Sequence, residues 1–168
     1  MLEGEVELLA GDAERAYDVF GDGHEALAAH SDTGFLATVV GLRAEAALRL
    51  GRDDEALELA DETERLAQRD DFEPVARTRL VRAQVMAKRG HFERADELLR
   101  DAAALIEPTD YLYFHIDLFD ARAEVNRLAS RPEAERAALA QAVAAAVRMG
   151  LLVAAEQAEA RLAELSHD

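Results

Sequence analysis

The sequence predicts an all-α protein: a right-handed superhelix of about four antiparallel helical hairpins, followed by a C-terminal capping helix. Turn-forming residues recur at intervals of 40, 39 and 40 positions, at Gly11, Gly51, Gly90 and Ser130. After each turn, apolar and small residues follow the i, i+3, i+4, i+7 spacing of one buried helix face. Alanine is abundant (36 of 168 residues) and proline is rare, which favours helix throughout. A fixed period of this length is typical of stacked hairpins.

Each repeat is expected to contribute two helices to a single domain. The repeats span about residues 1–31, 32–70, 71–109 and 110–150, and the capping helix lies in 151–166. The expected helices lie near residues 2–10, 13–29, 34–50, 54–68, 73–89, 93–106, 111–129, 133–148 and 151–165.

The second helix of each hairpin carries the apolar stripe. In the third repeat the stripe is Ala95, Leu98, Leu99, Ala102 and Leu105, and three of the four repeats begin it with alanine, whereas the fourth has Glu135. Seven residues before each turn, the first helix carries a small residue, and these are Gly4, Ala44, Ala83 and Ala123. A small side chain lets the partner helix approach closely at the point where the two helices cross.

The turn residues agree with this division. The three turn glycines suit the left-handed backbone that follows a helix C-terminus. Asp12 and Asp53 are candidate N-caps, and Ser130-Arg131-Pro132-Glu133 is interpreted as a capping box with proline in the first turn. Further caps are expected in the connections at 31–33, 70–71 and 107–110. Gly21-Asp22-Gly23 predicts a kink or local fraying of the second helix.

The first expected helix is short and has no cap. We therefore expect the chain to begin inside a repeat, as a piece of a longer protein. Val6, Leu8 and Leu9 would then be exposed at that end, where an apolar patch favours self-association.

Composition narrows the classes of partner. The net charge is −16, which argues against nucleic acid, because phosphate contacts need clustered cations. The absence of cysteine excludes disulfides and fits a reducing compartment. There is no signal peptide and no apolar run of membrane length, so we expect a cytoplasmic protein that does not contact a membrane.

The repeat pattern resembles the tetratricopeptide repeat (TPR) family in a long, degenerate form. The small residues of the first helices, the turn glycines, and Ala16, Ala56 and Ala95 match that family's pattern. The period near 40 exceeds the family's 34, and the bulky aromatic and the closing proline are mostly missing. More narrowly, the stretches 48–60, 88–99 and 103–110 look like the C-terminal repeats of bacterial signalling regulators that carry a cyclase or DNA-binding domain with an AAA or STAND ATPase. The resemblance implies a scaffolding or sensing segment, with catalysis elsewhere.

Nothing in the sequence indicates an enzyme, a cofactor or a metal site. His24 and His30 are six residues apart, which places them on different faces of a helix, whereas two histidines that share a metal on a helix need a spacing of four. Acidic pairs such as Asp53-Asp54 lie at predicted turns, where solvated charge and capping are the ordinary roles.

One expected helix, 73–89, is basic in an acidic chain. Arg77, Gln84 and Lys88 share roughly one face, which in tetratricopeptide arrays lines the concave groove, and the residues predicted to complete a groove there are Glu45, Arg49, Asp117 and Glu124. One interpretation is a clamp for an acidic peptide or a carboxylate. The alternative is that the cations pair with acidic residues of flanking helices, such as Asp61, Glu62, Glu64, Asp117 or Glu124.

The leading functional hypothesis is therefore a protein–protein interaction or regulatory scaffold module. Its partner would be a protein or peptide, including another domain of its own parent protein. The alternative is a domain that senses a small anionic effector.

Overall fold

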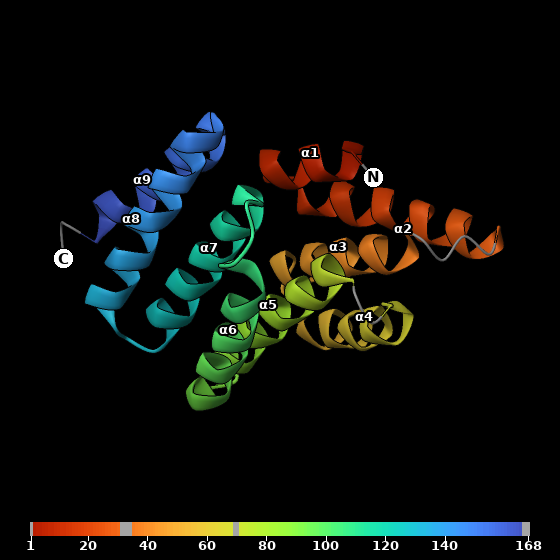
Figure 1. Cartoon of the computed structure of the whole chain (residues 1–168), viewed down its shortest axis with the longest axis horizontal. Coiled ribbons are helices and arrows are strands. Elements are labelled where there is room, and N and C mark those ends of the chain that lie inside the picture. The colour runs from red at the N-terminus through yellow and green to blue at the C-terminus, as the bar shows by residue number, and fades with distance from the viewer. Residues whose placement is uncertain (1, 31–34, 69–70, 166–168) are drawn as a thin grey trace. The chain divides into compact units, whose positions relative to one another are not determined.

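The computed structural model describes residues 2–30, 35–68 and 71–165, and these residues are helical without any strand. The helices are α1 (Leu2–Ala10), α2 (Ala13–Ala29), α3 (Leu36–Arg49), α4 (Asp53–Leu66), α5 (Phe72–Lys88), α6 (Phe92–Ile106), α7 (Leu112–Leu128), α8 (Pro132–Met149) and α9 (Leu152–Glu164) (Figure 1). The expected all-α class is confirmed, and every helix boundary lies within two residues of its predicted position.

The chain forms two compact units, residues 1–85 and 86–168, and the boundary falls inside α5. In the first unit α1 packs on α2, α2 on α3 and α3 on α4. In the second unit α6 packs on α7, α7 on α8 and α8 on α9. Within each unit, helices that are consecutive in the sequence are therefore neighbours in space, as hairpins require.

Close approach of two helices at a small residue is visible in both units. Gly4 of α1 is buried, and a Cβ atom added there would lie 2.6 Å from the ring of Phe20 in α2. In the second unit Ala123 of α7 packs in one cluster with Leu139 of α8. Both pairs are sixteen residues apart and hold the same place in their repeats, so a smaller side chain faces a larger one at each crossing.

Glycines with a left-handed backbone form the turns more consistently than side-chain N-caps do. Gly11, Gly51 and Gly90 adopt φ of 86°, 72° and 78°, as expected for helix C-termini. Asp12 accepts a hydrogen bond of 3.0 Å from the backbone N–H of Arg15, so this predicted cap is correct.

Two of the other predicted caps are wrong. Asp53 is the first residue of α4, and Arg52 occupies the cap position without a side-chain bond. At 107–110, the residue before α7 is Tyr111, again without a side-chain cap. Asp71, which directly precedes α5, accepts a bond from the backbone N–H of Gln68, and the cap expected at 70–71 stays a prediction. The expected cap at 31–33 lies outside the described residues.

The fourth hairpin keeps the fold with different residues. Ser130 has a φ of 56° and so takes the left-handed role of glycine, while Arg131 precedes α8. The predicted capping box is therefore wrong, although Pro132 does begin the helix. Glu135, which stands where other repeats have a fully buried alanine, is also buried. Its charge helps to raise the pKa of Arg127, after the larger effect of a hydrogen bond to Glu124.

Two further expectations are corrected. The stretch Gly21–Gly23 does not fray, because α2 continues through it and packs closely on α3. A Cβ atom placed on Gly21 would lie 3.5 Å from Arg43, and one placed on Gly23 would lie 3.4 Å from Val39. At the N-terminal end Val6 is exposed as expected, but Leu8 is buried, so the apolar patch there is smaller than predicted.

We predict that Gly4→Ala destabilises the chain by about 1–3 kcal/mol, because the added methyl group clashes with Phe20. The direction of the change in unfolding free energy is informative, because Gly→Ala at a solvent-exposed position inside a helix stabilises a protein by about 0.5–1 kcal/mol. Urea unfolding followed by circular dichroism measures it. The double variant Gly4→Ala, Phe20→Leu copies the pair of the fourth repeat and should regain part of the loss. A stabilising Gly4→Ala would contradict the proposed close crossing.

We predict that Ser130→Gly stabilises the second unit by about 0.5–1 kcal/mol, because a left-handed backbone costs a non-glycine residue about 1 kcal/mol or more. The matched control is Ser130→Ala, which keeps the Cβ atom and should give no gain. Chemical unfolding of the three proteins compares them. Equal stability of the glycine and alanine variants would count against a strained turn.

Candidate functional site

The charged residues that the sequence singled out form an ion-pair network in the first unit. Glu45 of α3 accepts a bond of 2.7 Å from Arg49 and also pairs with Arg77 of α5. Arg49 additionally donates to the carbonyl oxygen of Leu8 in α1 at 3.0 Å, and Arg77 lies 3.6 Å from Glu73. The network therefore joins α1, α3 and α5 of this unit.

Arg77 is a structural residue in this network, not a solvent-facing one. Its side chain is 2% exposed, and its stem passes 3.4 Å from the position of a Cβ atom at Gly41, which makes room for it. The clamp interpretation requires Arg77 to be open to an acidic ligand, and its burial against Glu45 does not meet that requirement. The reason is non-local: the carboxylate that binds it, on Glu45, is 32 residues away in sequence.

Burial and pairing act in opposite directions on the carboxylates of this network. Burial alone would raise the pKa of Glu45, but the guanidinium groups of Arg49 and Arg77 outweigh it and hold this pKa below the ordinary value of 4.5. For Glu5, burial dominates and raises the pKa, with Arg77 only partly opposing it. The fold therefore favours the charged form of Glu45 and disfavours the charged form of Glu5.

The remaining cations of α5 are also occupied. Arg82 lies 2.6 Å from both Asp61 and Glu64 of α4, so the alternative interpretation, pairing with a flanking acidic helix, is confirmed for this residue. Gln84 is half-buried, and its amide donates to the carbonyl oxygen of Leu80. Lys88 is exposed and lies close enough to Glu124 to help lower its pKa.

A second network belongs to the second unit. Glu124 accepts two bonds from Arg127, of 2.7 and 2.9 Å, and Arg161 of α9 lies 3.8 Å away. These bonds from Arg127 are the main reason that the pKa of Glu124 is lowered. Asp117, in the same helix, is half-buried. The seven predicted groove residues therefore belong to two separate groups, each engaged by its own unit.

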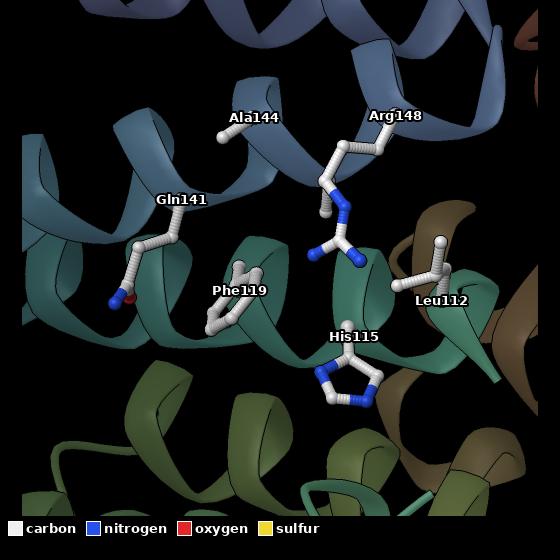
Figure 2. A pocket seen from close by; sticks show the side chains of 7 residues that line it. Leu112, His115, Phe119, Gln141, Ala144 and Arg148 are labelled. Atoms are coloured by element: carbon white, nitrogen blue, oxygen red, sulfur yellow. The ribbon is translucent and has the colours of Figure 1, made fainter. Parts of the chain in front are cut away.

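Sequence reasoning missed a hollow between α7 and α8, of about 220 Å³ (Figure 2). Four of its seven lining residues are apolar and three are polar. The lining residues are Leu112, His115, Phe119, Gln141, Ala144, Ala145 and Arg148.

Arg148 distinguishes this hollow from the rest of the charged surface. Figure 2 shows its side chain extending from α8 toward α7, into the space beside Phe119, Leu112 and His115. Among the described residues it has no hydrogen-bond or ion-pair partner. His115 lies with Nε2 3.0 Å from the carbonyl oxygen of Thr109, so Nε2 carries the proton and donates. Its other ring nitrogen, Nδ1, is therefore the acceptor when the imidazole is neutral.

The sequence of α8 and the start of α9 does distinguish this region, by its low content of charged residues. Residues 137–155 contain a single charged residue, Arg148, in a chain that is 32% charged. Within this stretch several large apolar side chains are exposed, on both sides of the turn at Gly150. We call Val147, Met149, Leu152 and Val153 the α8–α9 apolar surface.

Other classes of site find little support in the described part of the chain. No group of three or more His, Cys, Asp or Glu there is arranged to hold a metal ion. His24 lies 3.5 Å from Glu62, whereas His30 contacts the carbonyl oxygen of Ala26, so the two histidines have different partners. No helix among these residues has the length and hydropathy to cross a membrane.

Comparison with protein-family models, curated proteins and solved structures gives no match for this chain. The resemblance to tetratricopeptide arrays is therefore carried by the residue pattern alone.

We predict that Arg77→Glu destabilises the first unit by about 3–5 kcal/mol, because it breaks a buried pair and places a new carboxylate beside Glu45 and Glu73. Lys88→Glu, at an exposed position of the same helix, should change stability by less than about 1 kcal/mol. Thermal and urea unfolding compare the two variants. An Arg77→Glu protein as stable as the parent would restore the clamp interpretation.

We predict that Glu45→Gln lowers stability at pH 7 and that its deficit relative to the parent shrinks below about pH 4. The folded pKa of Glu45 lies below its unfolded value of 4.5, so its contribution is complete above 4.5 and is lost as the pH falls through the folded value.

Glu5→Gln is the control of opposite sign. Because the pKa of Glu5 is raised, its charged form opposes folding, and the variant should be the more stable protein at pH 7 and lose that advantage on acidification. Urea unfolding from pH 3 to pH 7 gives both differences. Stability differences from the parent that do not vary with pH, in either variant, would contradict these assignments.

Proposed function

We propose that this chain is a protein-binding helical-repeat module and that its docking surface is the α8–α9 apolar surface. The observation that carries the proposal is the exposure of this surface within a stretch that has one charge in nineteen residues. Leu152 is 68% exposed, Val147 58% and Val153 52%. These side chains lie within seven residues of one another in the sequence, around the turn at Gly150, and neighbouring exposed apolar side chains mark interaction sites on soluble domains.

Neighbouring positions of α8 support the same surface. Ala137, Ala140 and Ala144 are exposed at spacings of three and four residues before Val147, so this face of the helix carries no acidic residue over three turns, and Arg148 lies at its edge. Small side chains at these positions leave room for the backbone of a second helix to approach. The partner we propose is an amphipathic helix of another protein, or of another domain of the parent protein, with its apolar face against this surface.

The wider class is a scaffold of stacked hairpins resembling a long tetratricopeptide superhelix, in a regulatory part of a larger bacterial signalling protein. The equivalent helix crossings at Gly4 and Ala123, and the left-handed turns forty residues apart, support a repeat of one hairpin design. We propose a cytoplasmic setting and a binding role without catalysis. The acids and bases with the strongest contacts are engaged with one another, as in Glu45 with Arg77, which suits a scaffold.

We predict that a display library of helical peptides, selected on this chain, yields binders with apolar residues at i, i+3 or i+4, and i+7. Their affinity should fall at least tenfold for the double variant Val147→Asp, Leu152→Asp, because charge on the surface opposes its desolvation. The matched control is Phe35→Ser, which removes an equally exposed apolar side chain in the first unit.

Fluorescence anisotropy of the selected peptides measures these affinities, and sedimentation velocity establishes whether the chain associates with itself. Binders that ignore the double variant, or a selection that enriches nothing, would contradict the proposal. Dimers that dissociate in the double variant would identify a second copy as the occupant and would likewise overturn it.

A further inference from the structure

We propose that the hollow between α7 and α8 binds a small carboxylic acid with an apolar body. This site adjoins the docking surface, because Ala144 lines the hollow and also belongs to the exposed face of α8. An arginine, not an apolar face, distinguishes the hollow. The hollow is about 220 Å³, which suits a ligand the size of a single-ring or short branched acid more than a drug-sized molecule.

The charge at the hollow selects the sign of the ligand. The chain carries 35 acidic and 19 basic side chains, and most described arginines lie against a carboxylate or a carbonyl oxygen. Arg148 has no such partner among the described residues, although acidic side chains are abundant. Its guanidinium, a planar fork of donors, matches a carboxylate in a two-bond arrangement.

The walls select the body of the ligand. Phe119 and Leu112 come from α7 and lie on either side of the guanidinium (Figure 2), and Ala144 and Ala145 come from α8, so much of the wall is apolar. The small alanines leave the volume that a larger residue would fill. A carboxylate with an attached ring or branched chain satisfies both features, because its charged end meets Arg148 while its body replaces water against Phe119.

Two further polar groups adjust the specificity. Gln141 lies at the other end of the hollow from the guanidinium and presents an amide with donors and an acceptor. The Nδ1 atom of His115 is the ring nitrogen that is not bonded to Thr109, so it is available to a ligand hydroxyl. Convergence of a few polar groups on an apolar space is the ordinary construction of a small-molecule site.

The test uses three probes that separate charge from body. Benzoate carries both features, acetate has the charge alone, and benzamide has the ring without the charge. Titrations of the full chain are followed by two-dimensional amide NMR, and benzoate should bind at least fivefold more tightly than either of the other probes. Its shifts should centre on residues 112–119 and 141–148. Equal affinity for benzoate and acetate, or shifts scattered over the surface, would overturn the proposal.

Variants at exposed positions then test the assignment without disturbing the core. Arg148→Gln should weaken benzoate at least fivefold, to the level of benzamide, and Ala144→Leu should block benzoate and benzamide alike by filling the hollow. The control is Arg65→Gln, since Arg65 is an exposed arginine in the first unit that likewise lacks a partner among the described residues. Benzoate affinity that survives Arg148→Gln, or that falls equally in Arg65→Gln, would refute the site.

Discussion

In the first and fourth hairpins, the contact between a small residue on one helix and a large apolar residue on its partner limits how far apart the two helices can lie. Where Gly4 faces Phe20, the ring occupies the space that even one methyl group would need. In the fourth repeat Ala123, which is larger than glycine, packs with Leu139, which is smaller than phenylalanine. In these two repeats a larger residue at one position accompanies a smaller residue at the other, whereas the second repeat has alanine at both equivalent positions, Ala44 and Ala60, each fully buried.

Local patterns in the sequence predicted the helices well because each depends on residues within one or two turns. Apolar spacing located every helix, and Gly11, Gly51 and Gly90 located the turns, since a left-handed backbone strongly prefers glycine. The same reasoning failed at Ser130, where a serine adopts that backbone, and at Asp53, where a good capping residue lies one position inside the helix. Caps depend on a single residue of register, and periodicity does not resolve that register.

The candidate site could not be predicted in the same way, because its charges are settled by partners far away in sequence. Helical spacing placed Arg77 on a face with Lys88, but it contained no information about Glu45 or about the room left by Gly41. In that space the Arg77 guanidinium stabilises the fold and does not bind a ligand, because separating it from the Glu45 carboxylate would leave two buried, unpaired charges. The hollow at Arg148 was missed for a related reason: its walls come from two helices whose register a single sequence does not give.

The distribution of charge connects the fold to the proposed functions. A chain with a net charge of −16 repels itself, and its arginines relieve that repulsion most where they bridge helices, as Arg82 does between α5 and α4. Pairs between helices, together with pairs three or four residues apart within one helix, engage most of the cations in the described part of the chain with its own carboxylates. Residues 137–155 are the exception in both respects, because they lack acidic residues altogether and hold one arginine without a partner among the described residues. A surface of this kind neither repels an apolar partner by charge nor satisfies its own cation, which is why both the docking surface and the anion site are assigned to α8 and its neighbours.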